Sequence, residues 1–204
     1  MNTCYIIGAG EADIVKIKKC DGDFVICADG GLKAAQKSGI NPDLIVGDFD
    51  SFGSVPNGAN VIVHPAEKDE TDTHLAINCG LERGFKRFIM YGMLGGRLDH
   101  TFANLQLLSY LCENGASGML IGCGHKVTAV KNSRIDFDEV ESGMISVFSL
   151  TPESVVTISG LKYEVDNFTL KSSYPMGVSN EFLGKKSSVT AHDGTLLIIW
   201  EDKS

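Results

Sequence analysis

The sequence lacks the cysteine and histidine spacings that mark zinc sites and redox motifs. No two of its six cysteines stand at C-x-x-C spacing, and its five histidines show no metal-ligand spacing. Most of the cysteines lie inside apolar runs such as "FVIC" (24–27) and "MLIGC" (119–123). We therefore expect buried, reduced thiols rather than disulfides or a zinc site.

Long apolar runs and an excess of basic residues are also missing. No segment approaches the roughly 20 apolar residues of a membrane-spanning helix. The opening stretch "MNTCYIIGAGEAD" has no basic region of the kind that begins a signal peptide. The net charge of −8 argues against a general nucleic-acid-binding surface, which needs a basic face. We expect a cytoplasmic protein that binds neither nucleic acid nor membranes.

The common phosphate-binding loop is absent too. The pattern G-x-x-x-x-G-K-[ST] does not occur in the sequence. The segment "GAGEAD" (8–13) resembles the turn that follows a first strand, but it does not have G-x-G-x-x-G spacing. A plain turn and a nucleotide contact are both open for this segment.

Short apolar segments alternate with helix-like segments up to about residue 124 of the 204. The patterns predict strands at 4–8, 24–28, 44–46, 60–64, 87–92 and 118–122, and helices at 11–19, 31–39, 70–83 and 97–114. Continuous apolar strands separated by helices indicate a parallel sheet covered on both faces. We expect an α/β fold with an N-terminal, Rossmann-like domain over residues 1–124.

The pattern of apolar and turn-forming residues changes after that point. Short β-branched segments follow one another, separated by Gly, Asn and Pro, and no helical pattern stands out. We expect strands at 125–131, 143–150, 154–160, 168–173, 187–192 and 195–200. The pattern predicts an antiparallel β-sandwich or small barrel over residues 125–204.

Acidic motifs follow four consecutive strands of the predicted parallel sheet. They are "ADGG" (28–31), "GDFDS" (47–51), "HPAEKDETD" (64–72) and "GGRLDH" (95–100). The carboxyl ends of parallel strands share one edge, where ligands bind. Any one of these Asp residues is common as a turn residue or a helix cap, and Asp69 is a candidate cap for the helix that starts near Thr71. The four motifs together, with Lys68 and Arg97 among them, favour a site.

Asp48 and Asp50 indicate a divalent metal. In a regular strand they would point to opposite faces, so they share a cation only if the chain bends away near Gly47. Carboxylates without sulfur or imidazole favour Mg²⁺, which proteins usually hold with one or two carboxylates plus substrate phosphates. Lys68 and Arg97 would supply positive charge for those phosphates. This combination is typical of phosphoryl transfer.

These motifs, followed by "SNEF" (179–182), resemble in their order those of the thiamine pyrophosphokinase (thiamine diphosphokinase) family, over nearly the whole chain. The resemblance implies an α/β catalytic domain, residues 1–124, that binds ATP and Mg²⁺. It implies a β-sandwich, residues 125–204, that helps to bind thiamine, and a homodimer with active sites between subunits. The implied reaction is attack of the thiamine hydroxyl on the β-phosphorus of ATP, which gives thiamine diphosphate and AMP.

The resemblance also implies roles for individual residues. The implied ligands of Mg²⁺ are Asp48, Asp50 and Asp72, with Asp29 beside them to orient the nucleotide or metal-bound water. The implied contacts to ATP phosphates are Lys68, Thr71 and Arg97. Asp99 would face thiamine as a possible base, whereas His100 is equally well explained as structural. Ser179 and Asn180 would bond the aminopyrimidine. Phe182 would stack on thiamine, a cation–π contact if it meets the thiazolium, or it is an ordinary core residue.

Three other functions stay open. A strand that runs into Asp-x-Asp also opens the haloacid-dehalogenase-type phosphatases, in which Asp48 would be the nucleophile. Those enzymes need a later Lys and a carboxylate pair, whereas Lys68 comes early and "GGRLDH" is no such pair. A diphosphokinase for another alcohol, such as a pterin, is the second alternative. A thiamine-binding module without catalysis is the third.

Overall fold

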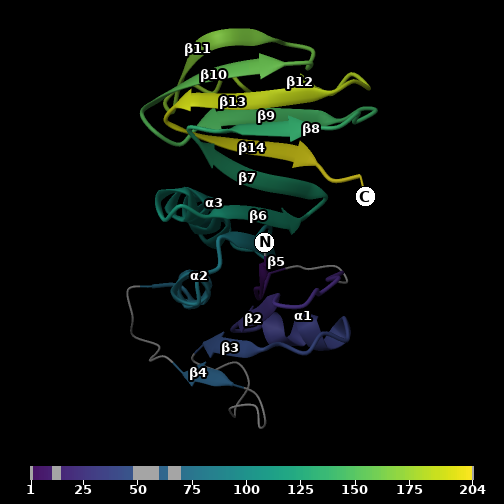
Figure 1. The fold of residues 1–204 in the computed structure, drawn as a ribbon, viewed down its shortest axis with the longest axis vertical. Helices are drawn as coiled ribbons and strands as arrows, with labels where there is room; N and C mark the ends of the chain where they lie inside the picture. The colour runs from purple at the N-terminus through teal and green to yellow at the C-terminus, as the bar shows by residue number, and fades with distance from the viewer. Residues whose placement is uncertain (1, 11–14, 48–59, 64–69, 204) are drawn as a thin grey trace. The chain divides into compact units, whose positions relative to one another are not determined.

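The computed structural model describes residues 2–10, 15–47, 60–63 and 70–203, and the chain forms two compact units (Figure 1). The first unit comprises residues 1–107 and 118–123, and the second comprises residues 108–117 and 124–204. The predicted site residues Asp48, Asp50 and Lys68 lie outside the described residues.

The first unit contains a parallel sheet of short buried strands. Their order is β6-β5-β1-β2-β3-β4, and the pairs β5–β1, β1–β2, β2–β3 and β3–β4 are parallel. The strands are β1 (Cys4–Ile7), β2 (Phe24–Ala28), β3 (Leu44–Gly47), β4 (Val61–Val63), β5 (Arg87–Tyr91) and β6 (Ser117–Gly122). Every residue of β1 and β3 is buried, which explains why these strands read as continuous apolar runs. The predicted parallel α/β fold is confirmed.

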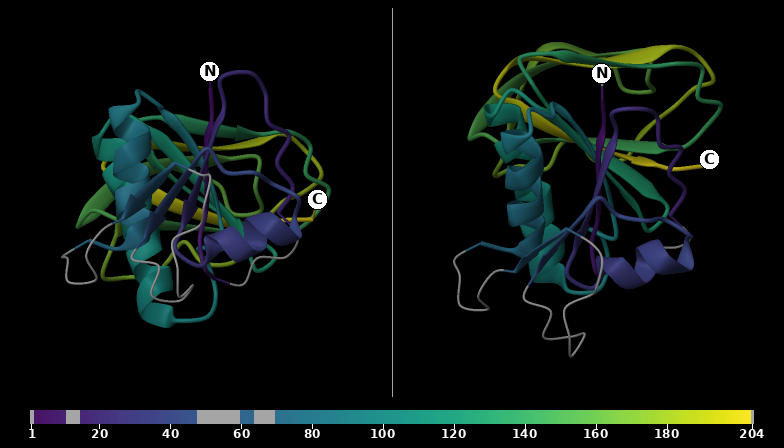
Figure 2. Two further views of the ribbon diagram at one scale, coloured as in Figure 1. Left: turned by 90° about the horizontal axis from the view of Figure 1, so that it is seen from below. Right: turned by 60° about the horizontal axis from the view of Figure 1, so that its bottom comes forward.

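Helices cover both faces of this sheet. They are α1 (Gly31–Lys37) and α2 (Asp72–Glu82), and the third helix of the described residues is α3 (Leu98–Glu113), whose residues belong partly to each unit. Leu32 and Ala35 of α1 share one core cluster with Tyr5 and Ile7 of β1. Gly80 of α2 instead approaches Cys4 and Phe88. Because neighbouring residues of a strand point to opposite faces, α1 and α2 lie on opposite sides (Figure 2).

The helix predicted at 11–19 is wrong for residues 15–19, which form neither helix nor strand. In this segment Val15 is buried, Lys16 is exposed, Ile17 is half-buried and Lys18 is exposed. That period of two does not match the period of a helix. The Val15 amide donates a hydrogen bond to Ser38 Oγ at 3.0 Å, so its backbone is paired outside a helix.

The second unit is antiparallel, as predicted. One set of strands has the order β12-β9-β14-β7 and the other has the order β11-β10-β13-β8. The strands are β7 (His125–Lys131), β8 (Arg134–Phe137), β9 (Met144–Ser149), β10 (Glu153–Ser159), β11 (Val165–Lys171), β12 (Asn180–Glu181), β13 (Ser187–Asp193) and β14 (Thr195–Glu201). Side chains from both sets, among them Val147, Val156 and Leu196, form one core. This is a β-sandwich.

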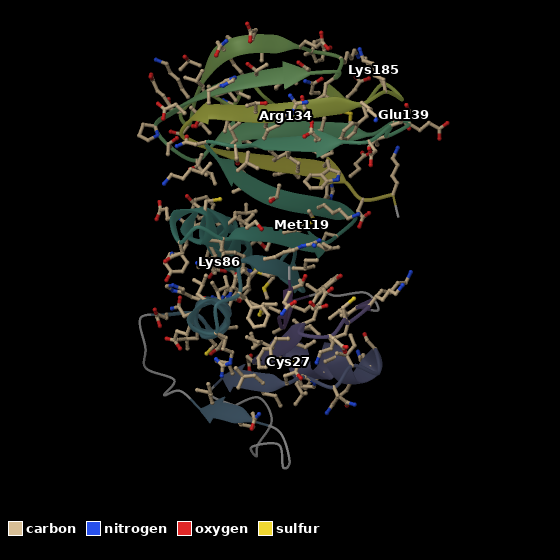
Figure 3. The ribbon with its side chains drawn as sticks, in the orientation of Figure 1. Cys27, Lys86, Met119, Arg134, Glu139 and Lys185 are labelled. Atoms are coloured by element: carbon tan, nitrogen blue, oxygen red, sulfur yellow. The ribbon has the colours of Figure 1, made fainter. Side chains whose placement is uncertain are left out.

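Side chains follow the expected division between interior and surface. Cys27 lies among the packed side chains of the first unit, whereas Glu139 and Lys185 project outward from the second (Figure 3). All six cysteines are free, and the predicted burial is confirmed for Cys4, Cys27 and Cys79 but is wrong for Cys20 and Cys123, which are exposed. None of the helices in the described part of the chain has the length and apolar character that crossing a bilayer requires.

Candidate active site

A cavity of about 740 Å³ opens in the first unit where β1, β2 and β5 end. Its volume lies in the range of roughly 300–1,000 Å³ that is usual for small-molecule sites. The segments that line it are residues 8–10 after β1, 28–29 at the end of β2, 70–73 at the start of α2, 92–93 and 95–97 after β5, and His100 and Asn104 on α3. The structure therefore brings Asp29, Thr71, Asp72 and Arg97 to one cavity at the carboxyl edge of the sheet.

Asp29 is held by its backbone at the end of β2. Its φ of +44° lies in the left-handed region, which Asp tolerates better than most residues. Its amide donates a hydrogen bond to the Val46 carbonyl at 2.8 Å. A Cβ atom placed on Gly47 would lie 3.2 Å from the Asp29 Cα, so the glycine permits close approach. The residue that precedes Asp48 in the sequence thus packs directly against Asp29.

The start of α2 contributes the next part of the cavity wall. Thr71 is the N-cap, and its Oγ1 accepts a hydrogen bond from the His74 amide at 3.2 Å. The N-cap position thus belongs to Thr71, and the other candidate, Asp69, lies outside the described residues. Asp72 is the first residue of the helix, where the helix dipole favours a negative charge.

Arg97 and Asp99 form an ion pair beside the cavity. Arg97 Nη2 lies 2.6 Å from Asp99 Oδ2, and Nε lies 3.2 Å from Oδ1. The hydrogen bond from Arg97 lowers the pKa of Asp99 from its ordinary value. Arg97 and His100 line the cavity. Because Asp99 stays ionised at neutral pH, it orients the guanidinium and is a weak base.

The predicted thiamine-binding residues of the second unit differ in their accessibility. Ser179 is exposed, with φ of +61°, and its amide donates to Ser146 Oγ at 3.1 Å. Asn180 is only 6% exposed. Its Nδ2 donates to the Tyr163 carbonyl at 2.8 Å, and its Oδ1 accepts from the Tyr163 amide at 2.9 Å. Asn180 therefore fixes the loop that carries Tyr163.

Phe182 lies in the core of the sandwich. It is 4% exposed, and its ring meets that of Phe137 edge-on with 5.3 Å between centroids. This position favours the core interpretation of Phe182 over stacking on a ligand. Trp200 packs partly buried against the same core.

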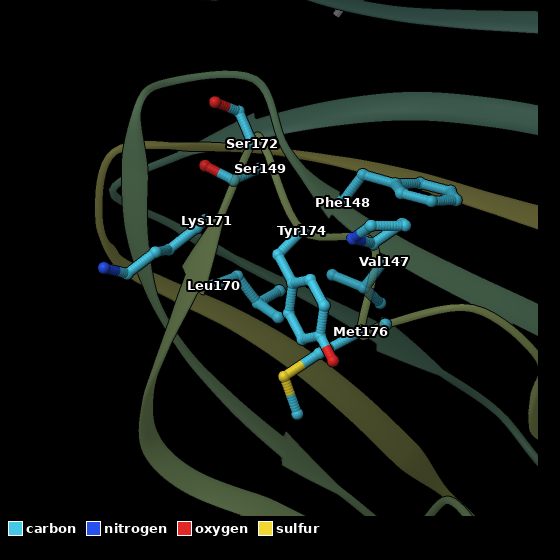
Figure 4. A pocket seen from close by; sticks show the side chains of 10 residues that line it. Val147, Phe148, Ser149, Leu170, Lys171, Ser172, Tyr174 and Met176 are labelled. Atoms are coloured by element: carbon cyan, nitrogen blue, oxygen red, sulfur yellow. The ribbon is translucent and has the colours of Figure 1, made fainter.

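Two hollows lie among the described residues of the second unit. One has a volume of about 380 Å³ and is lined mainly by apolar side chains, together with Tyr163 and the polar Asn180. The other is framed by Leu170, Tyr174 and Met176 (Figure 4), but at about 20 Å³ it has room for a water molecule and no more. Of these two hollows, the larger has the volume for part of an aromatic ligand.

The residues of the large cavity have donor atoms that suit a hard cation. Asp29, Glu70 and Asp72 supply carboxylates there, and Mg²⁺ prefers oxygen ligands. Among the described residues, no group of three or more His, Cys, Asp or Glu side chains is close enough together to hold a metal. The predicted ligands Asp48 and Asp50 are outside that part of the chain.

Reasoning from the sequence missed several residues of the cavity wall. Met93 and Asn104 line it and belong to none of the predicted motifs, whereas Glu70 lies within the motif "HPAEKDETD" (64–72) without a role assigned to it. A polar residue at position 104, within the apolar pattern of the 97–114 segment, was an available signal. Gly8, Ala9 and Gly10 also line the cavity, so the described part of the segment 8–13, for which a plain turn and a nucleotide contact are both open, belongs to the wall.

Comparison with known proteins gives two matching family models. The model described as "Thiamin pyrophosphokinase, catalytic domain" matches residues 18–119, half of the chain. The model described as "Thiamin pyrophosphokinase, vitamin B1 binding domain" matches residues 132–196. The first model ends and the second begins on either side of residue 124, where the sequence pattern changes from alternating strands and helices to short β-strands.

Individual relatives match over most of their length. A thiamine pyrophosphokinase of Bacillus subtilis (strain 168) is 28% identical over 182 residues, covering 85% of each chain. Thiamin pyrophosphokinase 1 of Caenorhabditis elegans is 28% identical over 172 residues, covering 78% of this chain and 71% of its own. A crystal structure of thiamine pyrophosphokinase from Bacillus subtilis superimposes with a TM-score of 0.87 at 23% identity, covering 99% of this chain and 100% of its own. The fold is the same.

Proposed function

Because the chain belongs to the thiamin pyrophosphokinase family, we propose that its large cavity binds ATP and Mg²⁺ for the transfer of diphosphate to thiamine. The products are thiamine diphosphate and AMP. The observation that carries this proposal is the convergence of Asp29, Thr71, Asp72 and Arg97 at one edge of the parallel sheet. We assign residues 1–124 to ATP and metal binding and residues 125–204 to thiamine binding.

Residues of the cavity wall divide by charge between the metal and the phosphates. Asp72, with Asp48 and Asp50, would hold Mg²⁺, which neutralises the phosphate tail when bound. Asp29 lies against Gly47 and would orient the nucleotide or water on the metal. Arg97 and Lys68 would bind phosphate oxygens. Thr71 accepts a hydrogen bond as the cap of α2, and its hydroxyl still carries one donor for a phosphate.

The transfer breaks one bond and forms one. The thiamine hydroxyl oxygen bonds to the β-phosphorus, and the bond from that phosphorus to the oxygen bridging to the α-phosphorus breaks, so AMP leaves. Asp99 would accept the hydroxyl proton. Its pKa is lowered by Arg97, which makes it a weak base. A weak base is sufficient if the transition state is loose, because little deprotonation then precedes attack.

We place thiamine recognition on the second unit. Ser179 is exposed and has a hydroxyl for the aminopyrimidine. Asn180 lines the 380 Å³ hollow, while its amide is bonded to Tyr163. Phe182 would support this segment from the core. We further propose that the enzyme is a cytoplasmic homodimer with active sites between subunits.

The test is a product analysis. The protein is incubated with ATP, Mg²⁺ and thiamine, and AMP, ADP, phosphate and thiamine diphosphate are separated. We expect equal amounts of AMP and thiamine diphosphate. ADP would mean that one phosphoryl group moved, and phosphate without a thiamine product would favour a phosphohydrolase. Bound thiamine without AMP would favour a binding module, and turnover with a pterin alcohol alone would favour the other diphosphokinase.

The role of Asp48 can be tested by removing its charge. Asp48→Asn should lower turnover by at least about 10²-fold, the scale of losing one electrostatic stabiliser. Asp21→Asn is the matched control, since Asp21 is an exposed turn residue of the same unit. Circular dichroism should be unchanged in both variants. If Asp48→Asn retained the wild-type turnover number, Asp48 would have no part in the transfer.

A further inference from the structure

The loop between β5 and α3, residues 92–97, carries Arg97 to the cavity and has little intrinsic rigidity. Gly92, Gly95 and Gly96 have φ values of +68°, +79° and +65°. Glycine loses more conformational freedom on folding than any other residue. A loop with three glycines must therefore be held by contacts to other segments if Arg97 is to take one position.

Asn104 makes such a contact from inside the molecule. It lies about two turns into α3, lines the cavity and is 7% exposed. Its Nδ2 donates a hydrogen bond to the Met93 carbonyl at 2.8 Å. Met93 is 3% exposed, so both partners are buried. Losing a buried partner costs more than losing an exposed one, because the other group stays unsatisfied.

Other contacts hold the remaining parts of the loop. The Gly10 amide donates to the Gly92 carbonyl at 2.9 Å. The Thr101 hydroxyl lies 3.2 Å from the carbonyl oxygens of both Gly95 and Arg97. The Gly10 contact thus holds Gly92 at the start of the loop, Asn104 holds the next residue, Met93, and Thr101 holds Gly95 and Arg97.

We propose that Asn104 is a positioning residue for diphosphate transfer. Its amide holds the Met93 carbonyl and so keeps the loop in the form that presents Arg97 to the phosphates of ATP. This inference rests on the proposed function for the role of Arg97. The hydrogen bond from Asn104 to the Met93 carbonyl does not itself depend on that function.

The test replaces the amide donor by an acceptor. Asn104→Asp sets a carboxylate oxygen against the Met93 carbonyl without a change of size. Asn114→Asp is the matched control, because Asn114 follows the same helix and bonds to the Tyr110 carbonyl at an exposed position. We expect amide hydrogen exchange in residues 93–97 to accelerate at least about tenfold in Asn104→Asp and to stay unchanged in the control.

Steady-state kinetics then distinguish a positioning role of Asn104 from a general loss of structure. We expect kcat/KM for ATP to fall by about 10- to 100-fold in Asn104→Asp, as for a misplaced binding group. The KM for thiamine should stay within about twofold. In an Arg97→Gln background, Asn104→Asp should lower kcat/KM for ATP by less than about twofold, because a positioning residue acts through Arg97. Asn104→Leu, which also removes the donor, should behave in the same way.

Several results would overturn the inference. If Asn104→Asp lowered kcat/KM for ATP as much in the Arg97→Gln background as in the wild type, the inference would be overturned. An amide exchange rate in residues 93–97 that did not change in Asn104→Asp would overturn it as well. If neither Asn104 variant kept the wild-type circular dichroism and melting curve, Asn104 would be a general structural residue. If the wild-type protein formed no AMP, the proposed function would fail and this role with it. An active wild type with an unaffected Asn104→Asp variant would refute the positioning role alone.

Discussion

Gly31 sets how closely α1 can approach β1, and so where the cavity wall begins. A Cβ atom at this position would overlap the Ile7 carbonyl. Gly31 is the first residue of α1 and is buried. Ile7 ends β1, directly before the glycines that line the cavity. The close approach of helix and strand therefore depends on the missing side chain.

Gly31→Ala should therefore destabilise the first unit without requiring a change of φ. We expect the free energy of unfolding to fall by about 1–3 kcal/mol, the usual cost of overpacking. Gly122→Ala is the control, since its added Cβ would lie 3.8 Å from the nearest atom and should cost less than about 0.5 kcal/mol. Urea unfolding measures both. Equal stability of the two variants would contradict this account.

The start of α2 combines a structural role with a place on the cavity wall. Thr71 caps the helix through its hydroxyl and also lines the cavity. A loss of activity in Thr71→Ala would not tell these roles apart, because removing a cap also costs about 1 kcal/mol of stability. Aspartate is as good a cap as threonine or better, but it brings a negative charge to the proposed phosphate site.

Thr71→Asp should thus keep α2 intact while it impairs ATP binding. We expect a melting temperature at or above that of the wild type and a KM for ATP raised at least about tenfold, since like charges repel at short range. Thr71→Ser, which keeps the hydroxyl, should resemble the wild type in both measurements. An unchanged KM for ATP in Thr71→Asp would place the phosphates away from this helix terminus.

Apolar periodicity predicted most of the elements and failed where its signal was weak. β1 and β3 were predictable because every residue in them is buried. Residues 15–18 alternate in burial with a period of two, which does not fit the helix that the sequence predicts over 11–19. β8 (Arg134–Phe137) has only two apolar residues and β12 (Asn180–Glu181) has none, so pattern alone could not identify them.

The site was predictable as a set of motifs, and less so as a set of contacts. Asp29 and Arg97 could be assigned to one edge because parallel strands end together. The pairing of Arg97 with Asp99 and the burial of Asn104 depend on side-chain packing, which the motif pattern does not encode. Phe182 shows the same limit, since an aromatic residue in a motif can be a core residue of the sandwich.

At the scale of the whole molecule, the cysteines distinguish interior from surface. Burial raises the pKa of Cys4 and of Cys27 to about 12, whereas Cys20 and Cys123 are exposed. The thiolate is the reactive form. A raised pKa means less thiolate at every pH below it, so at pH 8 only about one in 10⁴ of the buried thiols is ionised.

Iodoacetamide at pH 8 should therefore alkylate Cys20 and Cys123 in the folded protein and leave Cys4 and Cys27 unmodified. Peptide mass spectrometry identifies the modified residues. In urea above the unfolding transition all four should react, because the unfolded thiols return to their ordinary pKa. Gly31→Ala should speed the modification of Cys4 and Cys27 in the absence of urea, since a less stable first unit opens more often. Rapid alkylation of Cys27 in the folded wild type would contradict the packed parallel sheet on which the cavity is built.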